Sequence, residues 1–65
     1  MIHRTFDSEL DCPWMTIDVQ ITYVVYEEMG LVEVDQIMAH GYDVTEWFNH
    51  DYIMDLIQDD MEERA

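Results

Sequence analysis

The chain has 65 residues, of which 16 are Asp or Glu and only two are Arg or Lys, so its formal net charge is −14. This length corresponds to one small domain, and the single cysteine, Cys12, excludes an internal disulfide. Nucleic acids and anionic membrane surfaces would repel such a chain, so we expect it to bind neither directly. The patterned apolar residues, 49% of the chain, favour a folded domain over a disordered one.

The N-terminal segment, residues 1–13, shows no sustained hydrophobic period, and Pro13 disfavours a helix before it. We therefore expect an irregular N-terminal arm over residues 1–13 and a single small α+β domain over residues 14–65. The start of the chain lacks the apolar run of a signal peptide. Together with the lone cysteine, this favours a cytoplasmic location.

Residues 14–26 alternate between two faces, which is typical of a long β-strand with one buried face. The expected inward residues are Met15, Ile17, Val19, Ile21, Tyr23 and Val25. Residues 27–30 predict a hairpin loop in which Gly30 adopts the left-handed conformation.

Residues 31–39 are expected to form the returning strand, with Val32 and Val34 in the core. The looser pattern over residues 35–38 indicates a β-bulge. His40–Gly41 predicts a second turn, after which residues 42–44 form a short third strand.

The last segment predicts a short helical turn capped by Thr45 and then an α-helix over residues 50–63 capped by Asn49. Its apolar stripe is expected to pack on the sheet. The predicted fold class is therefore α+β, with an antiparallel β-hairpin or three-stranded sheet packed against a C-terminal α-helix. The predicted core comprises Ile17, Val19, Ile21, Tyr23, Val32, Val34, Ile53, Leu56 and Ile57.

A row of carboxylates follows one side of the predicted helix: Asp51, Asp55, Asp59 and Glu63 recur every four residues, flanked by Asp60 and Glu62. A helix spaces such residues about 6 Å apart, and like charges at this spacing destabilise it slightly. Two interpretations remain open, a partner-binding row and a solvated face. Further candidate partner-binding carboxylates lie on the other elements, at Asp18, Glu33, Asp35, Asp43 and Glu46.

Regularly spaced carboxylates on a rigid scaffold can replace the phosphates of a nucleic acid. The expected partner is then a basic protein that normally binds DNA or RNA through a groove lined by Lys and Arg. On the outer face of the first predicted strand, Trp14, Val24 and Tyr26 are either a second buried surface or a dimer or partner patch. A small core at this length makes a homodimer an expectation as well.

Catalytic and cofactor chemistry is not expected. His3, His40 and His50 are too scattered for a metal motif. Cys12 has no obvious base near it in the sequence, as an activated nucleophile would need. We therefore predict a protein that is not an enzyme and that needs no metal and no cofactor.

The stretch from Thr16 to Glu63 resembles small acidic accessory proteins of tailed bacteriophages. The resemblance rests on two alternating strands, at residues 16–23 and 31–35, on Gly41, on the triplet Asp43-Val44-Thr45 and on the acidic helix over residues 50–63. The chain departs from that pattern in its short inter-strand loop and in Glu46-Trp47-Phe48, which replaces an aliphatic pair.

The resemblance implies a phage origin, action in the cytoplasm of the host cell and inhibition of host defence or repair. The expected function is a phage-type inhibitor that binds a host nucleic-acid-binding protein through a DNA-like acidic surface. Restriction enzymes, CRISPR effectors, recombination nucleases and uracil-DNA glycosylase are candidate targets. The alternative is a small structural or assembly protein of a phage particle, in which the charge serves solubility.

Overall fold

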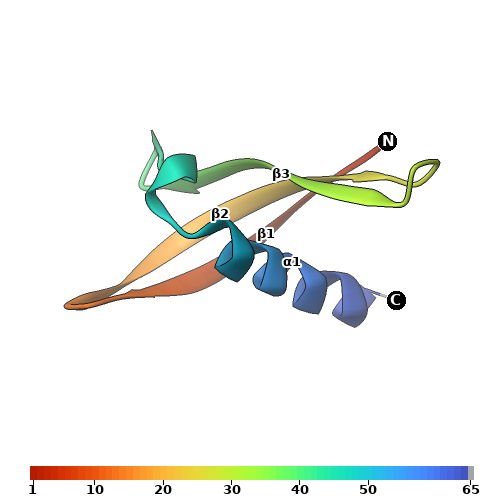
Figure 1. The fold of residues 1–65 in the computed structure, drawn as a ribbon. Coiled ribbons are helices and arrows are strands. Elements are labelled where there is room, and N and C mark those ends of the chain that lie inside the picture. Colours follow the sequence, from red (N-terminus) through yellow and green to blue (C-terminus); the bar gives the residue numbers. More distant parts are fainter. Residues whose placement is uncertain (65) are drawn as a thin grey trace.

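The computed structural model describes residues 1–64, which form a four-stranded antiparallel sheet and a C-terminal α-helix (Figure 1). The order in space is β1-β2-β3-β4, so each strand pairs with its neighbour in the chain. The α+β class is confirmed, and the sheet has more strands than expected. The elements are β1 (Ile2–Cys12), β2 (Met15–Tyr26), β3 (Leu31–Ala39), β4 (Tyr42–Asp43), the 3₁₀-helix η1 (Thr45–Trp47) and α1 (His50–Arg64).

The N-terminal segment is not an irregular arm, and that prediction was wrong. β1 pairs with β2 along its whole length, from Ile2 opposite Val25 to Cys12 opposite Met15. The alternation is hidden in the sequence because Arg4 and Ser8 occupy inward positions beside apolar neighbours. A strand can carry such polar inward residues when the neighbouring strand supplies the apolar contacts.

The predicted turns are confirmed by their backbone conformations. Gly30 closes the β2–β3 loop with a φ of 64°, in the left-handed region that glycine adopts readily. His40 and Gly41 connect β3 to β4 with φ values of 52° and 84°. Positive φ at both central residues defines a type I′ turn, the geometry that matches the twist of the two strands it joins.

A β-bulge corrects the phase of β3. Thr22 of β2 lies opposite Gln36, whereas the next residue, Tyr23, lies opposite Val34, so Asp35 is the extra residue. Because one extra residue exchanges the two faces of a strand, Val34 before the bulge and Ile37 after it face the same side. The bulge expected over residues 35–38 is therefore confirmed at its first residue.

The helix start is set by Asn49, as predicted. Its side-chain oxygen accepts hydrogen bonds from the backbone N–H groups of Asp51 (2.8 Å) and Tyr52 (3.4 Å), which a helix leaves unpaired at its first turn. Thr45, however, does not cap η1, because Val44 precedes that turn and no side chain caps it. The Thr45 hydroxyl instead accepts a hydrogen bond from the backbone N–H of Ile37 (2.9 Å), which joins η1 to β3.

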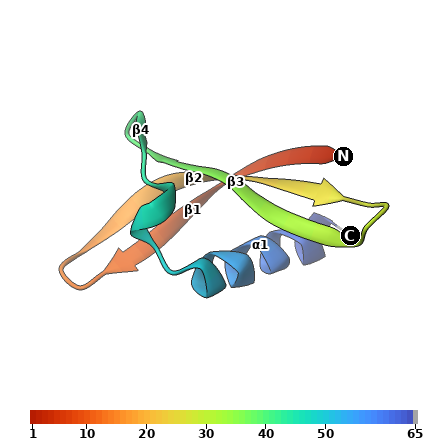
Figure 2. The same cartoon turned by 45° about the horizontal axis from the view of Figure 1, so that its top comes forward.

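The core lies between α1 and one face of the sheet, and the helix crosses that face obliquely (Figures 1 and 2). Of the predicted core, Val19, Ile21, Tyr23, Ile53 and Ile57 are buried, and Ile17, Val32, Val34 and Leu56 are partly buried against them. Three further residues complete the buried cluster: Leu10, Ile37 and Val44.

Ile57→Ala tests the placement of the helix. Ile57 is fully buried, so the substitution should lower the free energy of unfolding by about 2–5 kcal/mol, measured by chemical denaturation followed by circular dichroism. Met29→Ala is the control, because that side chain is 64% exposed in the β2–β3 loop; it should change stability by less than about 0.5 kcal/mol. Equal losses in the two variants would contradict the helix register.

Candidate functional site

The carboxylates predicted on the last helix are all exposed. Asp51, Asp55, Asp59, Glu62 and Glu63 project from α1 to solvent, while Ile53 and Ile57 face the sheet. We call the five carboxylates the acidic row. The row extends from the first turn of the helix to its last turn.

Asp60 lies in the same helix but turns toward the sheet. Its carboxylate accepts a hydrogen bond from the buried Tyr23 hydroxyl (2.7 Å) and one from Arg64 Nε (2.8 Å). Arg4 lies directly opposite Tyr23 in the β1–β2 pair, and its charge also acts on Asp60. Arg64 therefore pairs with Asp60, and the charge of Arg4 acts on the same carboxylate, on the side of the helix away from the acidic row.

The Asp60 contacts change the ionisation of both acidic partners. Partial burial opposes the charged carboxylate, but the hydrogen bonds from Tyr23 and Arg64, with the charge of Arg4, outweigh burial and lower the pKa of Asp60. Burial raises the pKa of Tyr23, and the hydrogen bond to Asp60 raises it further. The sequence signal for the Asp60–Arg64 pair is its i, i+4 spacing, but the tyrosine partner comes from β2 and leaves no such signal.

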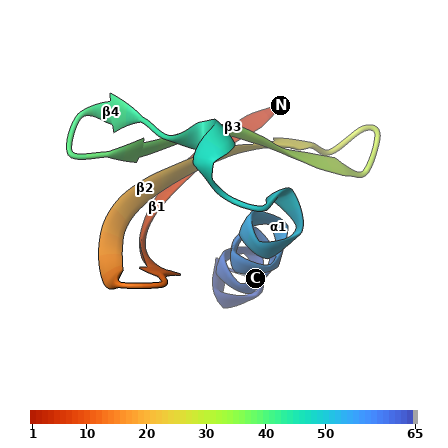
Figure 3. The same cartoon turned by 60° about the vertical axis from the view of Figure 1, so that its left-hand side comes forward.

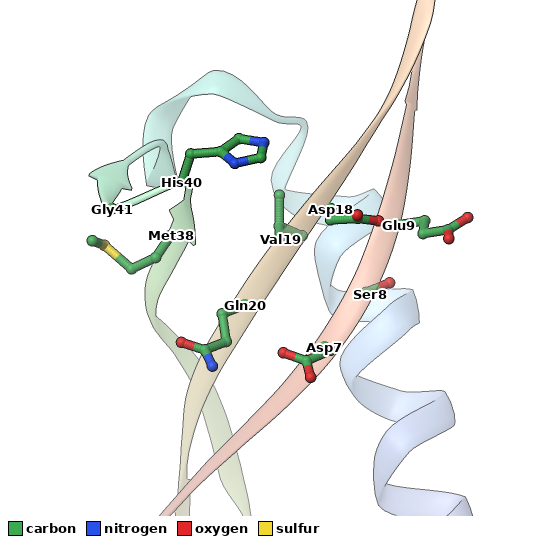
Figure 4. A pocket seen from close by; sticks show the side chains of 9 residues that line it. All are labelled: Asp7, Ser8, Glu9, Asp18, Val19, Gln20, Met38, His40 and Gly41. Carbon is green, nitrogen blue, oxygen red and sulfur yellow. The ribbon is translucent and has the colours of Figure 1, made fainter.

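The carboxylate predicted on β2, Asp18, lies on the opposite side of the sheet from α1. It is paired with Glu9, and the next outward pair toward the middle of the strands is Gln20 with Asp7. A shallow hollow of about 680 Å³ lies here, and the side chains around it include Met38 of β3 and His40 of the β3–β4 turn (Figure 4). The acidic residues of β1 were not among the predicted site residues, because residues 1–13 were expected to be irregular.

The remaining predicted carboxylates are divided between two places. Glu33 lies opposite Val24 on the outer sheet face. Asp35, Asp43 and Glu46 surround a hollow of about 450 Å³ beside η1. The ten predicted carboxylates thus do not form one surface: the sheet separates the acidic row from Asp18 and Glu33.

Asp43 has an internal role in addition to its exposure. Its carboxylate accepts hydrogen bonds from the backbone N–H and the hydroxyl of Thr45. The hydroxyl bond and then the backbone bond lower the pKa of Asp43. Because the Thr45 hydroxyl also accepts from Ile37, Asp43 is part of the junction between β4, η1 and β3.

The structure does not bring together Trp14, Val24 and Tyr26, the residues predicted as a dimer or partner patch. Trp14 is in the β1–β2 turn, and Val24 and Tyr26 lie near the opposite end of β2. Val24 is only 5% exposed, since it occupies a central strand between His3 and Glu33. A homodimer stays a prediction that sedimentation analysis can check. Within the described chain, β1 is an edge strand of the sheet, and such an edge can pair with another strand.

A surface that the sequence did not predict lies on the helix side of the sheet, beyond the N-terminal end of α1. There a groove of about 550 Å³ is lined mainly by apolar side chains. Tyr42, Trp47 and Met15 line it and are among the most exposed large apolar residues of the domain. We call this the apolar groove, and its remaining residues are Thr16, Ile17, Ala39, His40, Asp43, Val44 and Phe48.

Neither a metal cluster nor a membrane-spanning segment is found in the part of the chain that is described. Among residues 1–64, no group of three or more His, Cys, Asp or Glu side chains is placed to hold a metal ion. Within the same residues, α1 falls short of the length and apolar character needed to cross a bilayer. Comparison with protein-family models, with curated proteins and with solved structures finds no match to this chain.

Asp60→Asn tests the network that holds the end of the helix. The variant should be less stable than the wild type by about 1–3 kcal/mol near pH 7, because the hydrogen bonds to a charged acceptor are lost. Asp59→Asn is the matched control on the exposed side and should be neutral or slightly stabilising, since it relieves like-charge repulsion.

The direction of the Asp60 pKa shift predicts how the stability difference between wild type and Asp60→Asn changes with pH. The pKa of Asp60 is lower in the folded chain, so its carboxylate stabilises the fold above the unfolded pKa, and this contribution is lost as the pH falls through the folded pKa. The difference in unfolding free energy between wild type and Asp60→Asn should therefore shrink below about pH 4. A difference that stays constant down to pH 2 would contradict the ionised network.

Proposed function

We propose that this protein is a phage-type inhibitor that occupies the basic nucleic-acid-binding groove of a host protein through the acidic row of α1. The observation that carries the proposal is the separation of charges on the helix. Five carboxylates face solvent, whereas Arg64, the basic residue of the helix, is drawn to Asp60. The exposed side thus presents one sign of charge along its whole length.

The rigidity of the helix supports the same function. Asn49 fixes the start of α1, Ile53 and Ile57 anchor it to the sheet, and Asp60 fastens its last turns to β2. Carboxylates spaced about 6 Å apart on such a helix keep their positions when a partner approaches. A preformed negative surface raises the rate of association with a positively charged groove and loses little conformational entropy on binding.

The position of the row also restricts how a partner can approach. The carboxylates of the outer sheet face lie behind the sheet, so a groove that contacts α1 does not reach Asp18 or Glu33. Binding through the helix and binding through the sheet are therefore separate possibilities, and they can be distinguished by substituting one set of carboxylates at a time.

The test compares two variants with equal loss of charge. The first neutralises the row by Asp55→Asn, Asp59→Asn, Glu62→Gln and Glu63→Gln; Asp51 is kept because it stabilises the first turn. The second neutralises Asp7, Glu9, Asp18 and Glu33 on the outer sheet face in the same way. Both variants should fold. The row variant should melt at a higher temperature than the wild type, because the substitutions relieve repulsion within the helix.

Partners captured from a bacterial lysate are then titrated with each variant at two salt concentrations, with DNA or RNA as a competitor. The row variant should bind at least about tenfold more weakly, chiefly through slower association, and the outer-face variant should bind like the wild type. Wild-type binding should weaken steeply with salt and compete with nucleic acid. A ternary complex of partner, nucleic acid and inhibitor with undiminished affinities would refute the mimicry and favour an assembly role.

A further inference from the structure

The apolar groove lies where the helix does not cover the sheet. α1 begins beyond η1 and runs toward the β2–β3 loop, where Met54, Ile57 and Met61 approach Gly30 and Val32. The β1–β2 hairpin bends down on the same side of the sheet as α1, but at the other end (Figure 3). The groove is formed between this hairpin, β4 and η1.

The groove exposes three large apolar side chains. Met15 is 58% exposed, Tyr42 74% and Trp47 73%. Exposed apolar residues that gather in a concave surface mark contact sites more often than isolated ones do. Methionine and aromatic side chains adapt to different partners and are enriched in the centres of interfaces.

The charges around the groove are all of one sign. Asp43 and Trp47 belong both to the groove and to the adjoining hollow that contains Asp35 and Glu46. His40 also borders the hollow that contains Asp7, Glu9 and Asp18, but those carboxylates lie on the opposite side of the sheet from the groove. Within residues 1–64, neither arginine lines any of these three surfaces.

We propose that the apolar groove binds a basic amphipathic segment of another protein. Apolar side chains of that segment enter between Met15, Tyr42 and Trp47, and its Lys or Arg side chains lie toward the adjoining hollow that contains Asp35 and Glu46. Charge complementarity selects this occupant: an apolar groove that adjoins an acidic hollow matches a helix or strand with an apolar face and a basic flank. The proposal does not depend on nucleic-acid mimicry by the acidic row.

A second copy of the chain fits the groove less well. Each copy has a formal net charge of −14, and its own exposed apolar residues are accompanied by carboxylates, so association through this groove would bring like charges together. A basic segment from another protein carries the opposite charge, so the same carboxylates attract it.

The test uses a synthetic Leu/Lys peptide with Leu at positions i, i+3, i+4 and i+7, labelled for fluorescence anisotropy. A peptide of the same composition in scrambled order is the control for charge alone. The full-length protein should bind the amphipathic peptide at least about tenfold more tightly than the scrambled one. Equal binding of the two peptides would overturn the proposal, because the groove would then contribute nothing beyond charge.

Variants of the protein locate the contact. Trp47→Ala and Tyr42→Ser alter exposed side chains and should retain the fold, and each should weaken peptide binding about tenfold. Met29→Ala, an exposed apolar residue at the other end of the domain, should have no effect. Glu46→Gln should weaken binding about twofold to fivefold, whereas Glu28→Gln in the β2–β3 loop should not.

The remaining outcomes are also decisive. If neutralising the acidic row weakens peptide binding more than Trp47→Ala does, the peptide binds α1 and the groove proposal is wrong. If Trp47→Ala abolishes self-association in sedimentation experiments and leaves peptide binding unchanged, a second copy occupies the groove and the proposal is likewise wrong. The peptide experiment does not bear on the mimicry of nucleic acid by the acidic row. That proposal is tested separately by the competition titration.

Discussion

The orientation of the helix on the sheet depends on one carboxylate. Asp60 accepts hydrogen bonds from Tyr23 of β2 and from Arg64 of the same helix, and it lies close enough to Arg4 of β1 for that charge to act on it. Apolar contacts hold the middle of α1 on the sheet, but they are not directional. The hydrogen bonds at Asp60 fix the position of the last turns of α1, and they thereby fix the direction in which the acidic row points.

The same arrangement determines the charge distribution of the whole surface. A chain with two basic residues and 16 acidic ones could scatter its cations as local ion pairs. Here both cations act on one partly buried acid, so the exposed carboxylates keep their full mutual repulsion. Repulsion of this kind opposes compaction and is screened by salt. The domain therefore carries a destabilising surface that its core must offset, which is what a surface kept for binding, and not for stability, would require.

The two candidate contact surfaces differ in chemistry and lie at different ends of the domain. One end of the sheet is covered by α1 and carries the acidic row on the helix. The other end is left open and carries the apolar groove beside the hollow that contains Asp35, Asp43 and Glu46. The domain is elongated, about 40 × 20 × 17 Å, so the two surfaces can contact different parts of one partner or two partners.

The sequence by itself determined the features that depend on neighbours in the chain. Alternation over β2 and β3, the glycine conformations at Gly30 and Gly41, the Asn49 cap and the bulge at Asp35 all have local physical causes. Only the tertiary structure decided the features that depend on contacts distant in sequence. β1 was hidden because Arg4 and Ser8 face inward and interrupt its apolar period. The Asp60 network, the burial of Val24 and the apolar groove each depend on contacts between residues of different elements. The spacing of residues within one segment does not predict such contacts.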